Sequence, residues 1–368
     1  MKHISRYLDW YIHVGDLAYD LRSSGIQGFR YDLNLSNLDL GANYAYGNPE
    51  TARILAQRYN VKPENIFISG EGATGQNTRI FRIIAEKYPR KNEAIVEYPT
   101  YEPVLRQVQE FYPVVKRLDR KEKDMYHLDV SALRDIISER TGLLVITNPH
   151  APSGTILLKD ELKATMEIAH ENEVFVDCDE IYAEFNRGAV PTVFSVDSDF
   201  GIVTTSFTKA YGLGGLKLGI ALGSEMLVKE VYQDVLNTIG NSPNLVQTAT
   251  IQLLTTHKQQ LEEHKQKWLE LKRIIEDWFV DNQLDYWPNN MSITYWLKLP
   301  VKDSYEWINR QAIEKYRLGL VPGAFFMFED DYRLIKTSMT RLGFGAIKPE
   351  SETLERSLDV LSNALSNH

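Results

Sequence analysis

Short apolar runs alternate with amphipathic stretches between about residues 64 and 225. Five runs of strand length, each bounded by Gly, Pro, Asn or a charged residue, occupy residues 65–69, 93–97, 142–147, 173–177 and 201–204. Stretches between them, such as 76–88 and 159–172, space their apolar positions as helices do. Strands that alternate with helices are typical of a mainly parallel sheet. The pattern therefore predicts an α/β fold with a central sheet flanked by helices.

The pattern changes after about residue 245. Residues 246–281 combine helically spaced apolar positions with many charges, which predicts one long helix that bridges two domains. Apolar runs at 292–299 and 334–339 and a closing helix over 350–366 then predict a smaller α+β domain. The expected organisation has three parts, namely an N-terminal segment packed on the small domain (1–40), a large domain (41–245), and the interdomain helix with the small C-terminal domain (246–368).

Composition narrows the class of protein. The 368 residues suffice for a large core, and 50 acidic against 41 basic residues give a net charge of −9, which argues against a nucleic-acid partner. Cys178 is the single cysteine, and the eight histidines form no His-x-x-x-His pair, so we expect neither an internal disulfide nor a metal site. No run approaches the ~18 apolar residues of a membrane span. We expect a cytoplasmic protein without a membrane partner.

Lys209 follows a β-branched run and is expected just past the end of a buried strand, where α/β sheets collect their ligands. Ser206, Thr208 and Lys217 around it offer the donors that a phosphate monoester needs. A lysine amine whose pKa is lowered by desolvation can condense with an aldehyde. Although a solvated surface lysine is the plain alternative, the segment favours an anchor for pyridoxal 5′-phosphate (PLP).

A glycine-rich turn lies between the first of these strands and the next helix. In this turn, Gly70-Glu71-Gly72-Ala73-Thr74-Gly75, free N–H groups and the helix dipole would favour a phosphate. The turn also fits G-x-G-x-x-G, and Glu97 could serve as the ribose-binding acid, so an NAD(P)-dependent oxidoreductase is the rival hypothesis. That rival leaves Lys209 without a role.

Three further strand ends carry side chains that suit PLP. Tyr101 could place its ring flat against a pyridine, and Asn148 could donate to the phenolic oxygen of the cofactor. In the acidic cluster at the end of the fourth strand, a carboxylate that pairs with the pyridine nitrogen would keep that nitrogen protonated. Asp179 lies three residues before Tyr182, so both can point to one side of a turn. A core tyrosine, a plain loop and a solvated acid are the alternatives.

In their order and spacing these segments resemble the fold-type I, class I/II aminotransferases, in particular aspartate and histidinol-phosphate aminotransferases. The resemblance runs from about residue 35 to the C-terminus and is carried by Tyr46, Gly72-Ala73-Thr74, Tyr101, Asn148-Pro-x-x-Pro-Ser-Gly, Asp179-Glu-x-Tyr182 and Ser206-x-Thr-Lys209 with Lys217 eight residues on. It implies a PLP-dependent aminotransferase that moves an amino group between an amino acid and a 2-oxo acid.

The resemblance also implies roles for these residues. Lys209 would hold the cofactor covalently and act as the base, Asp179 would pair with the pyridine nitrogen, and Asn148 and Tyr182 would bind the phenolic oxygen. Tyr101 would stack on the ring. The phosphate would be bound by the Ala73 and Thr74 amides beside Gly72, by Ser206, Thr208 and Lys217, and by Tyr46 of a second subunit. A site completed in this way implies a homodimer.

Arg341 begins a segment, residues 341–345, that is similar to the one whose arginine binds the substrate α-carboxylate in this family. A planar guanidinium can hold a carboxylate through two parallel hydrogen bonds. Arg333 is the rival position, and a structural ion pair is the alternative for either arginine. We expect Arg341, together with Asn148, to bind the substrate.

Two positions depart from the family pattern. Lys217 stands where the family usually has arginine, and residues 35–39 lack the Gly-x-Pro pattern common near the substrate. A PLP-dependent lyase, decarboxylase or specialised biosynthetic enzyme uses much the same residues and remains an alternative. The sequence identifies no pocket for the substrate side chain.

Overall fold

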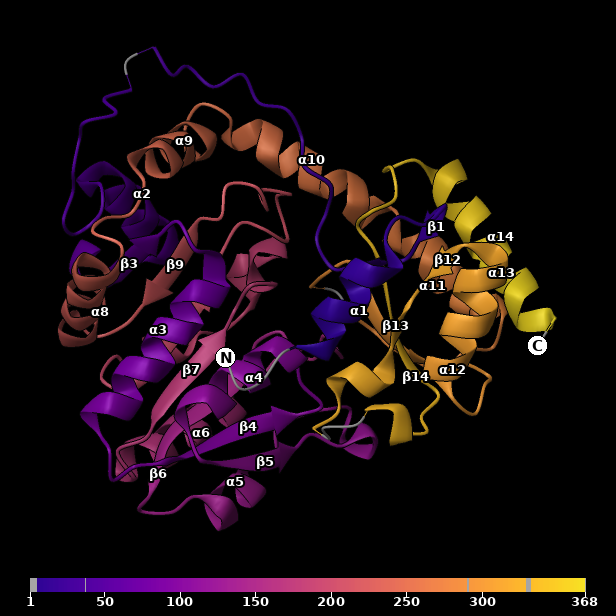
Figure 1. Cartoon of the computed structure of the whole chain (residues 1–368), viewed down its shortest axis with the longest axis horizontal. Coiled ribbons are helices and arrows are strands. Elements are labelled where there is room, and N and C mark those ends of the chain that lie inside the picture. Colours follow the sequence, from indigo (N-terminus) through magenta and orange to yellow (C-terminus); the bar gives the residue numbers. More distant parts are fainter. Residues whose placement is uncertain (1–4, 37, 290, 329–331, 368) are drawn as a thin grey trace.

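The computed structural model describes residues 5–36, 38–289, 291–328 and 332–367. Two lobes lie side by side in Figure 1, one built around a seven-stranded sheet and the other around a five-stranded sheet. Chain segments cross between the lobes at α10 and near the N-terminus. This architecture agrees with the expected α/β fold and its smaller α+β part, while the domain boundaries stay a prediction.

The larger sheet is parallel except for one strand. Its order is β3 (Ile66–Ser69), β9 (Gly219–Leu222), β8 (Gly201–Thr205), β7 (Phe175–Asp179), β6 (Thr141–Thr147), β4 (Glu93–Tyr98) and β5 (Val114–Asp119). Only β9 runs against its neighbours β3 and β8. The sequence pattern indicates five of these strands and misses β5 and β9. β5 is a largely polar edge strand, and β9 is four residues within a glycine-rich stretch.

Helices cover both faces of this sheet. One face packs against α3 (Gly72–Lys87), α4 (Glu102–Phe111) and α8 (Glu225–Thr238), and the other against α2 (Pro49–Tyr59), α5 (Val130–Ile136) and α6 (Lys159–Glu171). Neighbouring residues of β4 enter opposite cores, because Val96 packs in one apolar cluster and Ile95 in the other. Strands buried on both faces read as continuous apolar runs, which is why they stand out in the sequence.

The smaller sheet brings distant parts of the chain together. Its strands are β10 (Tyr286–Trp287), β11 (Thr294–Lys298), β14 (Met339–Phe344) and β13 (Val321–Pro322), and β2 (Arg22–Ser23) from the N-terminal segment pairs in parallel with β14. The apolar run at 334–339 is not the strand; β14 starts where that run ends and contains Arg341. The helices α11 (Lys272–Asp281) and α14 (Ser351–Ser366) pack together beside this sheet.

The expected single helix over 246–281 is three helices, α9 (Asn244–Leu254), α10 (Lys258–Glu270) and α11. At the first break the Thr255 hydroxyl donates to the carbonyl of Ile251, 2.7 Å away, and such bonding by a hydroxyl side chain competes with the helical pattern. In Figure 1 α9 and α10 lead from the larger sheet toward the smaller one, as a bridging segment should.

The N-terminal segment follows both lobes. Helix α1 (Arg6–Val14) lies between them, and β1 (Tyr19–Asp20) pairs with β12 (Leu318–Gly319). Farther on the chain arcs over α9 and α10 (Figure 1), where Gln252 Nε2 donates to the carbonyl of Asn34. In the described part of this segment, β1 and β2 pair with strands of the smaller lobe, whereas the later residues lie along the bridging helices.

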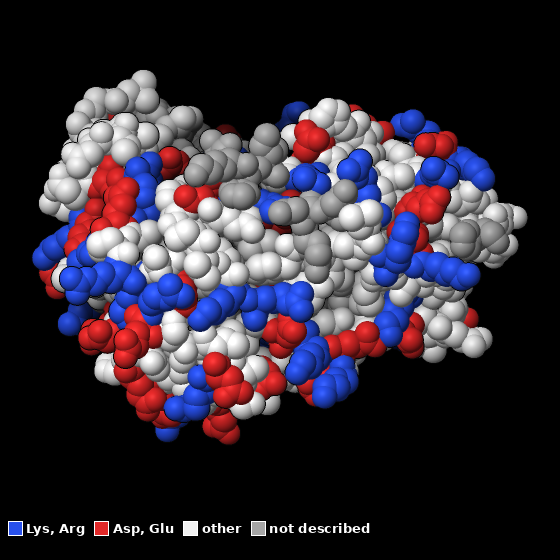
Figure 2. All heavy atoms as spheres, turned by 60° about the horizontal axis from the view of Figure 1, so that its bottom comes forward, with Lys and Arg blue, Asp and Glu red and all other residues white. Residues whose placement is uncertain are grey.

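The surface charges do not point to a particular kind of ligand or partner. Basic and acidic side chains lie next to one another over most of the face shown in Figure 2. In the part of the chain that the structure describes, every helix falls short of the length and apolar content needed to cross a bilayer. Within the same residues, no group of three or more His, Cys, Asp and Glu side chains could hold a metal ion.

Candidate active site

A cavity of about 630 Å³ opens at the carboxyl ends of the parallel strands and reaches across to the smaller sheet. Thr147 and Asp179 end β6 and β7, and Ser206 follows β8 at this edge. Thr294 and Arg341 close the cavity from β11 and β14. This is the edge at which α/β sheets bind their ligands.

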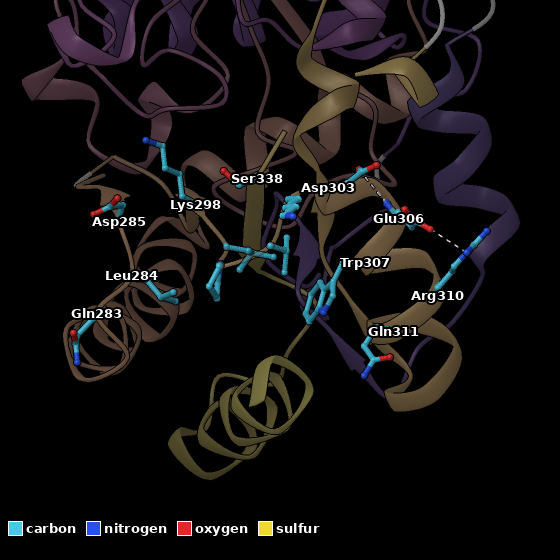
Figure 3. Close-up of a pocket in the computed structure, with 14 residues that line it drawn as sticks. Gln283, Leu284, Asp285, Lys298, Asp303, Glu306, Trp307, Arg310, Gln311 and Ser338 are labelled. Atoms are coloured by element: carbon cyan, nitrogen blue, oxygen red, sulfur yellow. Dashed lines mark hydrogen bonds and ion pairs between the residues drawn. The ribbon is translucent and has the colours of Figure 1, made fainter. Parts of the chain in front are cut away.

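A second, shallower hollow of about 970 Å³ lies on the smaller lobe, around Trp307, Lys298 and Arg310 (Figure 3). Its charged groups pair among themselves, since Glu306 contacts Arg310 at 2.9 Å. The sequence predicts none of its lining residues as functional, and no strand of the parallel sheet ends there. We therefore place the reaction in the smaller cavity.

Lys209 projects into this cavity from the turn after β8. Its Nζ donates to Ser24 Oγ at 2.9 Å. Burial, followed by the positive charge of Arg341, lowers the pKa of the amine to about 8, although Asp179 opposes this effect. An appreciable fraction of the amine is therefore neutral near neutral pH, which is the form that attacks a carbonyl carbon.

Asp179 is 8% exposed at the end of β7. Its Oδ1 accepts from the amide of Ile181 at 3.0 Å, and its Oδ2 accepts from Asn77 Nδ2 at 3.4 Å. Burial raises the pKa of this carboxyl group to about 6, while the two hydrogen bonds and Lys209 limit the rise. A cation placed beside this carboxyl group, such as a protonated pyridine nitrogen, would favour its ionised form.

The N-terminus of α3 is open toward the cavity. The residue before it, Glu71, makes no capping hydrogen bond with its side chain, which instead pairs with Arg79. Gly72 adopts φ of +68° and donates its amide to the carbonyl of Lys217 at 2.6 Å. Free helix amides favour an anion at such an end. Ala73 and Thr74 supply the next amides, and both line the cavity.

Hydroxyl and ammonium groups face this helix end. Ser206 Oγ donates to Thr208 Oγ1 at 2.6 Å and also accepts from the Thr208 amide at 3.0 Å. Lys217 is exposed, adopts φ of +55° and lines the same cavity. All the expected phosphate-binding residues of this subunit therefore meet at one end of the cavity.

Arg341 lies at the opposite end, on β14, and is 3% exposed. Its Nη2 donates to the Tyr7 hydroxyl at 3.0 Å and to the carbonyl of Arg22 at 2.7 Å. Its Nε has no hydrogen-bond partner among the described residues, so the guanidinium keeps a donor for a further acceptor. The rival Arg333 is exposed and does not line the cavity.

Two tyrosines complete the walls. The edge of the Tyr101 ring meets Tyr7 with ring centroids 5.8 Å apart, and Tyr101 lines the cavity. Tyr182 also lines it, and its hydroxyl lies near that of Ser24. Burial raises the pKa of both phenols above the usual value, so both stay protonated near neutral pH.

Asn148 differs from the expectation. Its Nδ2 donates to the carbonyl of Pro191 at 2.8 Å, and its Oδ1 accepts from the amide of Leu157 at 3.1 Å. Each half of the amide makes one of these hydrogen bonds, and the nitrogen keeps a second hydrogen. Asn148 is fully buried and does not line the cavity, so its expected roles toward the phenolic oxygen and the substrate stay predictions.

Two other candidate residues lie away from the cavity. Tyr46 is 60% exposed and packs against Tyr232 with ring centroids 5.5 Å apart. Glu97, the acid that the dinucleotide hypothesis needs, is fully buried. Its carboxylate accepts from the Thr147 amide and from Arg120 Nη1, both at 2.7 Å. It is therefore not placed to bind a ribose.

The structure adds three residues that the sequence did not indicate. Ser24 and Tyr7 reach the cavity region from the N-terminal segment, far from the motifs in sequence, and no local pattern marks them. Asn77, which contacts Asp179, is a buried polar residue one turn into α3. A polar side chain on the buried face of that helix is the signal that could have indicated it.

Comparison with known proteins agrees with this site. The family described as Aminotransferase class I and II matches residues 41–353. Histidinol-phosphate aminotransferase 2 of Haemophilus influenzae is 27% identical over 276 residues, covering 72% of this chain and 70% of that protein. The aspartate aminotransferase of Pyrococcus horikoshii is 26% identical over 243 residues, covering 62% and 60%.

Solved structures share the fold. A PLP-dependent aminotransferase from Streptococcus suis superimposes with a TM-score of 0.85 and 24% identity, covering 100% of this chain and 99% of that chain. Aspartate aminotransferase from Thermus thermophilus, solved with maleate, gives a TM-score of 0.79 and 18% identity over 98% and 94%.

The residues of the cavity fit PLP on their own chemistry. An uncapped helix end with hydroxyl and ammonium donors suits its phosphate, a buried acid suits its ring nitrogen, and Lys209 has the lowered pKa that its aldehyde requires. Taken with the match over residues 41–353, this shows that the chain belongs to the class I and II aminotransferase family, which has PLP fold type I and uses pyridoxal phosphate.

Proposed function

We propose that the chain transfers the amino group of an amino acid to a 2-oxo acid, with Lys209, Asp179 and Arg341 as the residues that carry the reaction. The observation that supports this most directly is their placement around one cavity. Lys209 and Asp179 come from neighbouring strand ends of the larger sheet, and Arg341 comes from the smaller sheet. Each has the charge or ionisation that its role requires.

The larger lobe would hold and tune the cofactor. When bound, PLP withdraws electrons from the bonds at the donor's α-carbon. The α3 N-terminus with Ser206, Thr208 and Lys217 would bind its phosphate, and the Asp179 carboxylate would keep its ring nitrogen protonated. Tyr182 would donate to its phenolic oxygen. Lysine at position 217 offers a point charge rather than a fork, so we expect looser phosphate geometry than an arginine would give.

Lys209 would act twice. As a neutral amine it would hold the cofactor, and once an amino donor had taken its place, the freed amine would remove the proton from the donor's α-carbon and carry it as an ammonium. Its pKa of about 8 suits both steps, because the amine can lose and regain a proton near neutral pH.

Arg341 would bind the α-carboxylate of the donor. Its Nη2 is held by Tyr7 and by the carbonyl of Arg22, which fixes the plane of the guanidinium. A carboxylate gripped in this orientation presents the α-carbon to Lys209 rather than to solvent.

A second copy of the chain is part of the proposal. Tyr46 points away from the cavity of its own subunit and is largely exposed, which suits a residue that reaches the phosphate of a neighbouring site. Three apolar residues that precede Tyr46 in the chain are also exposed, namely Phe29, Leu35 and Leu40. Exposed apolar side chains on one segment are typical of an interface. We infer a homodimer in which each Tyr46 completes the partner's site.

The experiment is a half-reaction followed by absorbance. Protein loaded with PLP should be yellow, should lose that colour with a suitable amino acid, and should regain it with a 2-oxo acid. Lys209→Ala should abolish the cycle, whereas Lys163→Ala, which removes an exposed lysine of α6, should not. Release of ammonia or carbon dioxide in place of oxo-acid exchange would show a lyase or a decarboxylase and would contradict the proposal.

A further inference from the structure

A short strap of the N-terminal segment connects the smaller sheet to Lys209. At one end, the amide of Gly343 in β14 donates to the carbonyl of Leu21 at 2.8 Å. At the other end, the amide of Ile26 donates to the carbonyl of Lys209 itself at 2.9 Å. We call residues 21–26 the strap. It is hydrogen-bonded to the backbone on both sides of the cavity, so its own side chains are held at fixed positions there.

Ser24 lies in the middle of the strap, is 9% exposed and lines the cavity. Its hydroxyl oxygen accepts from Lys209 Nζ at 2.9 Å. The next residue, Gly25, runs against the lysine stem, because a Cβ there would lie 3.1 Å from Lys209 Cδ. Both the stem and the amine of Lys209 therefore rest against the strap.

The same strap also holds the arginine at the far end of the cavity. The carbonyl of Arg22 accepts from Arg341 Nη2 at 2.7 Å, two residues before Ser24. One short stretch of backbone therefore sets the position of Arg341 and, through the Ser24 hydroxyl, the position of the Lys209 amine. The distance between these two groups decides whether a bound donor presents its α-carbon to the amine.

We propose that Ser24 is a positioning residue of amino-group transfer, whose hydroxyl holds the Lys209 amine on the side of the cavity where Arg341 would bind the donor's carboxylate. The inference rests on the proposed function and deepens it. Lysine has a flexible four-carbon stem, so its amine is ordered only by what it contacts. Among the described residues, Ser24 is the one hydrogen-bond partner of that amine.

The groups that face the Lys209 amine determine whether removal of the Ser24 hydroxyl should raise or lower the pKa of that amine. Asp179 from β7 favours the ammonium form, whereas Arg341 from β14 and Lys217 from the loop after Lys209 oppose it, and Tyr182 is neutral near neutral pH. A hydroxyl that accepts a hydrogen bond from the amine also favours the ammonium form, as the Asp179 carboxylate does. Without the Ser24 hydroxyl the amine should therefore lose its proton at lower pH.

The first test measures the amine directly in the full-length chain freed of cofactor. Acetic anhydride modifies neutral amines, and mass spectrometry gives the fraction of Lys209 modified at each pH. In Ser24→Ala and Ser24→Gly the midpoint of this profile should move down by about one pH unit. Ser366→Ala is the control, because Ser366 Oγ donates to the carbonyl of Ser362 at the exposed end of α14, away from the strap and the cavity. Its profile should match the wild type.

The second test uses the PLP-loaded enzyme and exchange of the donor's α-proton with deuterium from the solvent. Ser24→Ala should lower the maximal exchange rate about 10-fold and leave the donor KM within about twofold, since Arg341 is unchanged. Ser366→Ala should alter neither. Equal thermal midpoints would show that all the variants fold.

The outcomes separate this inference from the proposed function. If the wild-type protein takes up PLP on Lys209 and exchanges the α-proton, but both Ser24 variants keep the wild-type labelling profile and exchange rate, the role of Ser24 is wrong and the aminotransferase assignment stands. If the wild-type protein takes up no PLP on Lys209, the proposed function itself fails.

Discussion

Arg341 and Lys209 are single residues whose surroundings make their chemistry predictable. Burial and nearby charge shift the pKa of Lys209, and the hydrogen bonds that Arg341 donates to the Tyr7 hydroxyl and the Arg22 carbonyl fix its guanidinium. Because both effects come from named contacts, each leads to a quantitative test.

The pH dependence of cofactor attachment tests the environment of Lys209. The neutral amine attacks the aldehyde, and burial together with Arg341 lowers its pKa from 10.5 to about 8. The rate of attachment of PLP should therefore rise with pH through about 8 and level off above it. Stopped-flow absorbance over pH 6–11 measures this rate. A rate that keeps rising to pH 10 or beyond would show an ordinary, solvated lysine.

The KM for the amino donor distinguishes Arg341 from Arg333, the two arginines that the sequence offers for binding the α-carboxylate. Arg341→Ala should raise the KM for the amino donor roughly 100-fold, because a buried cation that would pair with the carboxylate is lost. Arg341→Lys should recover only part of this, since an ammonium lacks the planar fork. Arg333→Ala is the control and should stay within about twofold, as Arg333 is exposed outside the cavity. Reversal of the two effects would move the carboxylate site to Arg333.

Residues could be predicted from sequence where a strand end or a motif fixes the direction of the side chain. Lys209 and Asp179 follow apolar runs, and both line the cavity. Asn148 also follows such a run, yet its side chain turns toward Pro191. Its direction depends on contacts between two loops, and nothing local in the sequence records those contacts. The same holds for Ser24, whose partner Lys209 is 185 positions away.

At the scale of elements, the first turn of α3 is the most specific feature. Gly72 adopts φ of +68°, a conformation that costs a residue with a Cβ about 1 kcal/mol or more. Gly72→Ala should therefore strain the turn that presents the Ala73 and Thr74 amides, and should weaken PLP binding about fivefold or more. Fluorescence titration measures the affinity.

Gly188→Ala is the matched glycine-to-alanine control for Gly72→Ala. No atom lies within 4 Å of a Cβ added at Gly188, and its φ is not in the left-handed region. It should bind PLP as the wild type does. Equal affinities in both variants would show that the α3 turn does not hold the phosphate.

The pattern of apolar positions predicts elements that are long or buried on both faces. β6 and α6 lie within about two residues of the expected ranges. The pattern does not show β5, because an edge strand exposes much of its surface, or the break after α9, because neither a glycine nor a proline marks the end of that helix.

At the scale of the whole molecule, we propose that Tyr46 of a second subunit completes the site. Light scattering should give twice 42.3 kDa for the particle in solution. Tyr46→Ala should weaken PLP binding without changing the Lys209 labelling profile. A monomer that is fully active would contradict this part of the account.

Mixing two impaired variants tests the exchange of Tyr46 between subunits. Lys209→Ala and Tyr46→Ala chains refolded together should form mixed dimers, each with one intact site. Activity should then recover to about a quarter of the wild-type value. No recovery in verified mixed dimers would place Tyr46 outside the neighbouring site.

The central claim is a covalent bond between PLP and the side chain of Lys209. The most direct measurement is borohydride reduction of the PLP-saturated protein, followed by peptide mapping by mass spectrometry. We predict that the reduced cofactor is found on Lys209, at about one per chain. Cofactor found on another lysine such as Lys217, or on none, in protein saturated with PLP would contradict the account.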